Sequence, residues 1–160
     1  MKKVIYILFF VALLTLTCGP YSFRGTSLPG IKSIAIPIFQ NQTAEYGLGE
    51  SLTEKLVDGF VRNHILKVQN QKDANAILYG TITKYQRRAY TYEEQENIKE
   101  YIAEISVKVW LEDKNKKKNL WEEDMKGWGI YSVTEDEDLG KQRAVDKLVE
   151  DIINRTAKAW

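Results

Sequence analysis

The stretch ILYGTITKYQRRAYTY, residues 77–92, decides the fold of this chain. It is rich in β-branched and aromatic side chains and contains one glycine and no proline, so it predicts one long β-strand. Apolar and polar residues alternate again over 98–111, which predicts a second strand. The turn 112–119 holds four lysines and leads to a third strand at 120–128. The sequence therefore predicts a hairpin with a lysine-rich tip.

A further strand is predicted on the N-terminal side of this region, over KSIAIPIF at 32–39. Its three alternate isoleucines, Ile34, Ile36 and Ile38, are expected to share one face. Pro37 cannot donate a hydrogen bond to a neighbouring strand. We therefore expect this strand at an edge of the sheet, or with a free N–H side at Pro37.

Two amphipathic helices are predicted, one on each side of the central strands. The first begins near Gly47, with Thr43 as a candidate N-cap, and its apolar residues recur at helical spacing: Leu48, Leu52, Leu56, Val57, Phe60 and Val61. A short extended segment, 66–68, follows it. The second helix follows the acidic run 135–138, which suits a positive helix N-terminus, and its apolar stripe is Val145, Leu148, Val149, Ile152 and Ala159.

The predicted order is strand, helix, three strands, helix, within one domain over 31–160. This order indicates an α+β fold: a two-layer sandwich with two helices on one face of a mixed sheet of about four strands. The other face of the sheet would be open and would carry Tyr79, Thr81, Thr83, Tyr85, Ile102 and Trp110. Such a face is either a contact surface or a partly hydrated face whose hydroxyl groups meet water.

Residues 1–17 have the three parts of a secretory signal peptide: Lys2 and Lys3, an apolar run, and a short stretch of small or polar residues. The uncharged run from Val4 to Thr17 has 14 residues. A transmembrane helix needs roughly 20 apolar residues, so the length favours export over membrane anchoring by this segment.

Cys18 is the only cysteine of the chain and stands where the apolar run ends. An unpaired thiol is a liability in an oxidising compartment, and lipidation would consume it. The signal resembles that of bacterial lipoproteins, in which the cysteine carries the lipid and becomes the mature N-terminus. Residues 18–30, with Pro20, Pro29 and three glycines, are then a tether. Gly19 after the cysteine favours the outer membrane.

Catalysis and metal binding find little support in the sequence. His64, the only histidine, falls at a predicted helix end, and no metal-binding or nucleotide-binding motif is present. We therefore expect a protein that is not an enzyme, with no cofactor and no metal. Without residues 1–17 the chain has 21 basic and 22 acidic side chains, which excludes a strong field toward nucleic acid.

Basic side chains nevertheless cluster at two places and could bind phosphate groups. One cluster, in the second half of the long strand, is Lys84, Arg87 and Arg88. The other, at the hairpin tip, is Lys114, Lys116, Lys117 and Lys118. The alternative for the tip is a solvated turn that discourages aggregation. Arg87, Arg88, Lys116, Lys117 and Lys118 are the candidate binding residues.

Several segments together resemble LptE-type lipopolysaccharide-assembly lipoproteins. They are CGPYSFRG at 18–25, LPGI at 28–31, IAIPIFQNQT at 34–43, ANAILYGTITKY at 74–85 and LWEE at 120–123. The resemblance implies lipidation at Cys18 in the outer membrane and a role as a plug inside an LptD-type β-barrel partner. It also implies contact with lipopolysaccharide. The alternative is a curli-secretion-like lipoprotein that oligomerises into an export pore or scaffold.

Overall fold

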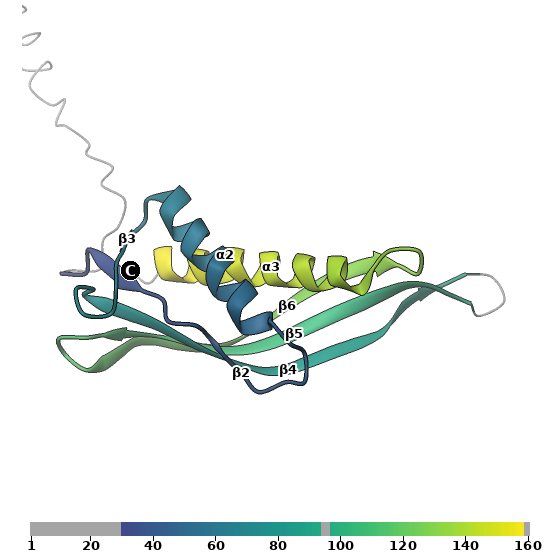
Figure 1. Cartoon of the computed structure of the whole chain (residues 1–160), viewed down its shortest axis with the longest axis horizontal. Coiled ribbons are helices and arrows are strands. Elements are labelled where there is room, and N and C mark those ends of the chain that lie inside the picture. Colours follow the sequence, from purple (N-terminus) through teal and green to yellow (C-terminus); the bar gives the residue numbers. More distant parts are fainter. Residues whose placement is uncertain (1–29, 94–96, 159–160) are drawn as a thin grey trace, which may run out of the picture.

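A computed structural model describes residues 30–93 and 97–158 of the chain. The elements, drawn in Figure 1, are β1 (Ser33–Ala35), β2 (Gln40–Asn41), α2 (Leu48–Asn63), β3 (Lys67–Val68), β4 (Ala76–Tyr92), β5 (Ile98–Asp113), β6 (Lys118–Ser132) and α3 (Glu137–Ala157). The expected signal peptide, Cys18, nearly all of the tether, and Ala159 lie outside the described residues.

One mixed sheet of six strands forms the lower layer in Figure 1, and both helices lie on the same face of it. The strand order is β3-β1-β4-β5-β6, and β2 pairs with β4 further along the same edge as β1. Strand β1 pairs in parallel with β3 and with β4, and β2 pairs in parallel with β4. The pairs β4–β5 and β5–β6 are antiparallel. The predicted two-layer α+β class is confirmed, with six strands in place of about four.

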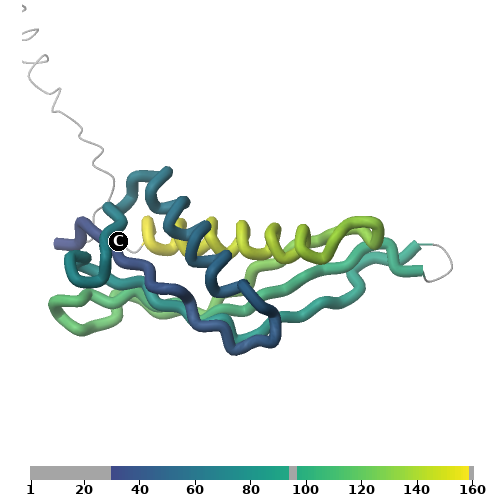
Figure 2. The backbone as a smooth tube through the Cα atoms, viewed as in Figure 1, coloured from purple at the N-terminus to yellow at the C-terminus, as the bar shows by residue number. Residues whose placement is uncertain are grey.

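The three long strands form a meander that extends past the helices at both ends, as the tube in Figure 2 shows. Their helix-facing side chains alternate as the sequence predicts: Ala103, Ile105, Val107, Val109 and Leu111 are all almost fully buried. Strand β6 is longer than expected and continues to Ser132. The main core is built between these side chains and the two helices.

The N-terminal strand differs from its prediction, because it is broken in two. Strand β1 ends at Ala35 and β2 begins at Gln40, with Pro37 in the break, where its missing N–H costs no ladder hydrogen bond. Ile38, expected to share a face with Ile34, is 66% exposed. Phe39 is buried in its place, and its ring fills the space that a side chain at Gly80 would need. β1 is also not an edge strand, since β3 covers it.

Helix α2 buries four residues of the predicted stripe, Leu48, Leu52, Leu56 and Phe60, which are at most 5% exposed. The prediction is wrong for Val61, which is 55% exposed, and Val57 is half-buried. The expected cap is wrong, because Thr43 bonds Asn41 and Gly47 occupies the N-cap position with φ of 77°. A glycine adopts this left-handed backbone without the Cβ clash of other residues. Thr53 fixes the helix to the broken strand by accepting a 2.9 Å hydrogen bond from the Phe39 N–H.

Helix α3 lies directly on β6, in backbone contact at two glycines. A Cβ on Gly127 would overlap the carbonyl oxygen of Ala144, and one on Gly129 would overlap that of Gly140. The helix begins at the expected acidic run, and the Asp136 carboxylate accepts a 2.9 Å hydrogen bond from the Asp138 N–H. Close packing of α3 on β6 and β5 leaves the opposite sheet face uncovered by helices.

Candidate functional site

The sheet face turned away from the helices, here called the open face, is covered by neither helix. Register places on it the alternate residues of β5 and their partners on β4 and β6. Tyr79 stacks on Trp110 at one end, with ring centroids 5.5 Å apart. Ile102 lies between Arg88 and Ile130 at the other end. Charged side chains fill the middle: Lys84, Glu104, Lys108, Glu122, Asp124 and Lys126.

A β-bulge changes which side chains of β4 reach this face. The register shifts between Ile82 and Lys84, so Thr83 has no direct partner and the alternation reverses after it. The prediction that Tyr85 lies on the open face is therefore wrong, whereas Tyr79, Thr81, Trp110 and Ile102 are placed as expected. Lys84 takes the position opposite Ser106 on the open face that strict alternation would have given to Thr83.

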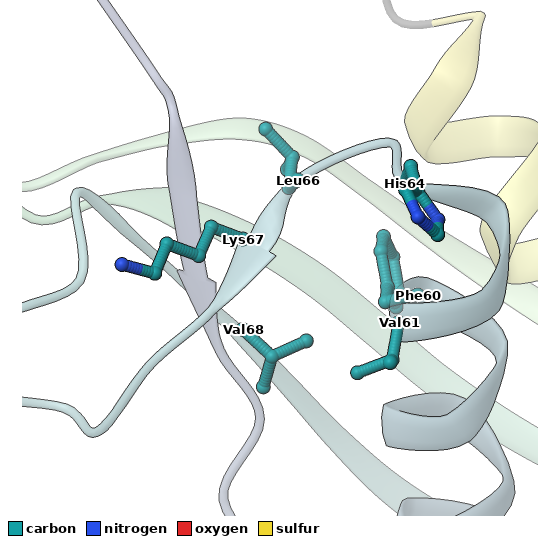
Figure 3. A pocket seen from close by; sticks show the side chains of 6 residues that line it. All are labelled: Phe60, Val61, His64, Leu66, Lys67 and Val68. Atoms are coloured by element: carbon teal, nitrogen blue, oxygen red, sulfur yellow. The ribbon is translucent and has the colours of Figure 1, made fainter.

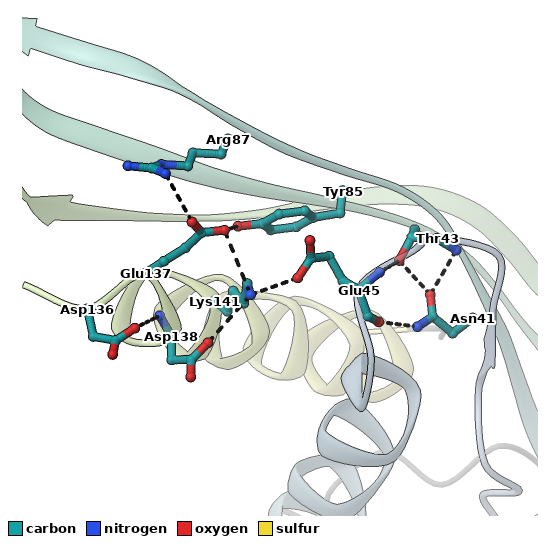
Figure 4. A network of polar contacts seen from close by, with 9 residues as sticks. All are labelled: Asn41, Thr43, Glu45, Tyr85, Arg87, Asp136, Glu137, Asp138 and Lys141. Atoms are coloured by element: carbon teal, nitrogen blue, oxygen red, sulfur yellow. Dashed lines mark hydrogen bonds and ion pairs between the residues drawn. The ribbon is translucent and has the colours of Figure 1, made fainter.

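On the helix side, Tyr85 joins a polar network that links three elements (Figure 4). Its hydroxyl donates a 2.5 Å hydrogen bond to the Glu137 carboxylate at the start of α3. Lys141, one turn along the helix, lies 3.7 Å from Glu137 and 2.7 Å from Glu45 of the loop before α2. Burial is the main cause that raises the pKa of Tyr85 far above its ordinary value, and the hydrogen bond to Glu137 adds to it. The network fixes α3 and this loop to β4.

Arg87 and Arg88, two of the predicted binding residues, lie on opposite faces of the sheet. Arg87 is on the helix side, where its guanidinium is 3.9 Å from the Tyr101 ring centroid and 3.3 Å from Glu137. Arg88 is on the open face and bonds Glu104 at 2.6 Å. Each arginine therefore already has an acidic partner, and the two do not form one cluster.

The predicted lysine tip lies at the far end of the sheet from both arginines. The strand between Ile102, which pairs with Arg88, and Asp113 at the tip spans about 35 Å at roughly 3.3 Å per residue. Asp113 is buried and shapes the turn, since its carboxylate accepts from the N–H groups of Asn115 and Lys116. Lys116, Lys117 and Lys118 are exposed there, with Lys116 3.6 Å from Asp113. The structure thus brings the three lysines together and keeps them apart from Arg87 and Arg88.

The middle of the open face brings together basic residues from distant parts of the chain. Register aligns Lys84, Ser106 and Lys126 in one row across β4, β5 and β6. Lys126 was not among the residues singled out from the sequence. The sequence indicates only that Lys126 lies in a strand. Its place beside Ser106 follows from the pairing of β5 with β6.

A mainly apolar hollow lies between the C-terminal end of α2 and β3 (Figure 3). It has a volume of about 360 Å³. Its lining residues are Phe60, Val61, His64, Leu66, Lys67 and Val68. The only histidine thus stands at a helix end, as expected, where its Nδ1 lies 3.0 Å from the Arg62 carbonyl oxygen.

Within residues 30–93 and 97–158, no three His, Cys, Asp or Glu side chains lie close enough together to hold a metal ion. Neither α2 nor α3 is long and apolar enough to span a bilayer.

The fold and the open face define a small two-layer α+β module with a charged and aromatic sheet face. The chain belongs to the LptE family, described as lipopolysaccharide-assembly, whose model matches residues 31–156. It is thus a member of a family of non-enzymatic outer-membrane lipoproteins that act in lipopolysaccharide assembly, as the resemblance implied. No curated protein sequence matches the chain significantly.

Several solved structures share the fold at low sequence identity. A protein from Xanthomonas campestris is 12% identical with a TM-score of 0.61, over 84% of this chain and 91% of that one. A hypothetical protein from Chlamydia trachomatis is 10% identical with a TM-score of 0.59, over 79% and 96%. A minor lipoprotein from Acinetobacter baumannii is 15% identical with a TM-score of 0.53, over 79% and 91%. At these identities the likeness concerns the fold alone.

Proposed function

We propose that this lipoprotein plugs an LptD-type outer-membrane β-barrel, helps it to assemble, and contacts lipopolysaccharide on its way to the cell surface. The observation that carries the proposal is the match to the LptE family along residues 31–156, which include both helices almost entirely and all six strands. In this proposal Cys18 carries the lipid, residues 18–30 are the tether, and the domain that starts at residue 31 enters the barrel lumen.

The chemistry of the open face supports a place inside a barrel. The lumen of an outer-membrane barrel is polar, and this face presents both signs of charge in close pairs. Lys108 bonds Glu122 at 2.7 Å and Arg88 bonds Glu104 at 2.6 Å. Stacked Tyr79 and Trp110 add a rigid aromatic contact of the kind enriched at protein interfaces.

Glycolipid contact is proposed for exposed basic residues, since ammonium and guanidinium groups bind phosphate by charge-assisted hydrogen bonds. Lys116, Lys117 and Lys118 form one such surface, and Arg88 belongs to another on the open face. The Arg87 guanidinium already contacts the Tyr101 ring and Glu137, so it is a weaker candidate than Arg88 and the three lysines.

The test is to purify the full lipoprotein from detergent-solubilised membranes and to identify what accompanies it. We expect one large β-barrel protein in equimolar amount. Recovery of a ring of this chain alone would contradict the proposal and would favour the oligomeric export alternative, which the family match does not favour.

A further inference from the structure

The apolar hollow between the C-terminal end of α2 and β3, here called the α2 hollow, presents apolar side chains to solvent (Figure 3). Val61 lines it and is 55% exposed, and Phe60, Leu66 and Val68 complete its apolar wall. Among the described strands, β3 is the outermost on this side of the sheet. An apolar recess at such an edge is a candidate binding surface.

The chain enters the domain beside this hollow. Lys67 lines the hollow, and its N–H donates a 3.1 Å hydrogen bond to the carbonyl oxygen of Lys32. Ser33 at the start of β1 pairs with the same Lys67. The segment that ends at Pro29, which lies outside the described residues, therefore joins the domain one strand away from the hollow.

The sequence at this junction is typical of a turn that reverses the chain. Gly30 has φ of 88°, close to the value of about 80° at the third residue of a type II turn. Leu28-Pro29-Gly30-Ile31 has the proline and the glycine that this turn prefers at its two central positions. A reversal here directs the residues before Leu28 back over the domain.

The preceding segment contains two aromatic residues that match the size of the hollow. Tyr21 and Phe23 are two positions apart, so their rings share one side of an extended chain. An apolar cavity of about 150 Å³ holds one benzene ring, and the α2 hollow has a volume of about 360 Å³. The hollow therefore has room for both rings. A buried tyrosine hydroxyl needs a hydrogen-bond partner, and His64 and Lys67 are the lining residues that can provide one.

Covalent attachment favours this segment over a partner in solution. Phe23 is seven residues before Gly30 and can lie up to about 23 Å from it, at roughly 3.3 Å per residue. Neighbouring strands are only about 4.8 Å apart, so the hollow is within reach. A linker of this length gives an effective concentration in the millimolar range, at which even a weak site is occupied.

We propose that Tyr21 and Phe23 dock in the α2 hollow and hold the N-terminal segment against this end of the domain. With the lipid proposed at Cys18, docking leaves only Gly19 and Pro20 between the lipidated residue and the docked rings. The hollow is then kept within about 10 Å of the lipid, whereas an undocked segment from Cys18 to Gly30 would reach about 40 Å. Docking thus decides which end of the domain faces the bilayer.

Trypsin provides the test, because Arg24 is the only lysine or arginine between Cys18 and Ile31. The rate of cleavage after Arg24 is measured by mass spectrometry on the full lipidated chain in detergent. Docking of the adjacent Phe23 shields this peptide bond, and cleavage then follows the population of the undocked form.

Three variants leave the cleaved sequence unchanged. Val61→Asp puts a charge into the hollow, and Val61→Ala keeps the same position apolar. Val133→Asp puts the charge at another exposed valine, in the turn before α3. Circular dichroism checks that all three are folded.

We expect Val61→Asp to be cleaved at least about tenfold faster than the wild type, since docking would bury an unpaired carboxylate beside two rings. A factor of ten corresponds to about 1.4 kcal/mol. Val61→Ala and Val133→Asp should be cleaved as slowly as the wild type. Equal rates in Val61→Asp and the wild type would overturn the inference.

A second measurement reports the contact directly and does not depend on Val61→Asp being folded. Aromatic rings shift the NMR signals of methyl groups that they contact. Tyr21→Ser/Phe23→Ser should therefore move the methyl signals of the lining residues Val61, Leu66 and Val68. Tyr46→Ser, which removes a 99% exposed ring from the loop before α2, should leave them in place. Methyl signals that do not move in the double variant would overturn the inference.

Two other occupants of the hollow have distinct signatures. Methyl signals that move in Cys18→Ser but not in Tyr21→Ser/Phe23→Ser would assign the hollow to an acyl chain of the lipid and overturn the inference. Protection of Arg24 that is lost on dilution would do the same in favour of a second copy of the chain. Failure to co-purify with a barrel would contradict the proposed function alone, because docking requires no barrel partner and no glycolipid.

Discussion

Tyr85 of β4 donates a 2.5 Å hydrogen bond from its hydroxyl to the carboxylate of Glu137, the first residue of α3. The bond exists because the bulge at Thr83 turns Tyr85 to the helix side of the sheet. Glu137 also holds Arg87 and Lys141. One carboxylate at the start of the helix therefore connects β4 to α3, and through Lys141 it connects α3 to the loop before α2.

This bond gives the stability of the protein an alkaline pH dependence. Burial, and then Glu137, raises the pKa of Tyr85 above the value of about 10 that it has in the unfolded chain. The folded state therefore holds the phenol proton more tightly than the unfolded chain does. The contribution of Tyr85 to the free energy of unfolding is complete below pH 10 and is lost as the pH rises above it.

We expect the free energy of unfolding to fall more steeply between pH 10 and 11 in the wild type than in Tyr85→Phe, measured by urea unfolding at each pH. Burial raises the pKa of Tyr131 too, so the variant keeps part of the slope. Equal slopes in the two proteins would contradict this assignment.

The backbone contact between α3 and β6 predicts a large effect for a single methyl group. Gly127→Ala would push a Cβ against the Ala144 carbonyl oxygen and Leu148, and the backbone atom cannot rotate away. We expect a loss of about 1–3 kcal/mol in the free energy of unfolding, the usual range for overpacking, measured by chemical denaturation.

The control is Asp124→Ala, at an exposed position of the same strand. It should change the free energy of unfolding by less than about 0.5 kcal/mol. If Gly127→Ala is as stable as this control, then α3 does not pack on β6 as closely as described.

Two apolar residues of α2 differ in burial, and their truncation to alanine should therefore cost very different amounts of stability. Leu56 is fully buried, whereas Val61 is 55% exposed. Leu56→Ala should lower the free energy of unfolding by about 2–5 kcal/mol, because it removes core contacts and leaves a cavity. Val61→Ala should cost less than about 0.5 kcal/mol. Thermal unfolding followed by circular dichroism distinguishes the two, and equal losses would show that the buried face of the helix is assigned wrongly.

Cys18→Ser tests the anchor, which lies outside the described residues. We expect the variant to lack the mass of the lipid and to leave the membrane fraction, because the lipid is attached to the cysteine sulfur that serine lacks. Mass spectrometry and fractionation measure both effects. An unchanged mass with full membrane retention would rule out lipidation at this cysteine.

Much of the fold could be predicted from local pattern. One face of each element must meet the core, so the spacing of apolar residues predicts which side chains are buried. This holds for the alternation in β4 and β5 and for the helical spacing of Leu48, Leu52, Leu56 and Phe60. The break in the first strand could not be predicted in the same way. Ile38 continues the alternation as well as Ile34 does, and Phe39 takes the core position because Gly80 on a neighbouring strand leaves room for its ring.

The candidate site was predicted only in part, for a related reason. Arg87 and Arg88 are adjacent in sequence, which predicts one basic cluster, but neighbouring residues of a strand point to opposite faces. Lys84 and Lys126 are 42 positions apart and meet in one row of the sheet. The one-residue bulge puts Lys84 into that row, where unbroken alternation would put Thr83, and turns Tyr85 to the helix side.

The α+β class, both amphipathic helices and the long strands follow from the periodic spacing of apolar residues, because each of these segments must bury one face in the core. The position of the bulge, the close approach of α3 to β6 and the composition of the open face are set only when the chain folds. These depend on register and on the atoms of distant segments, and a shift of one residue in register moves every later side chain to the other side of the sheet.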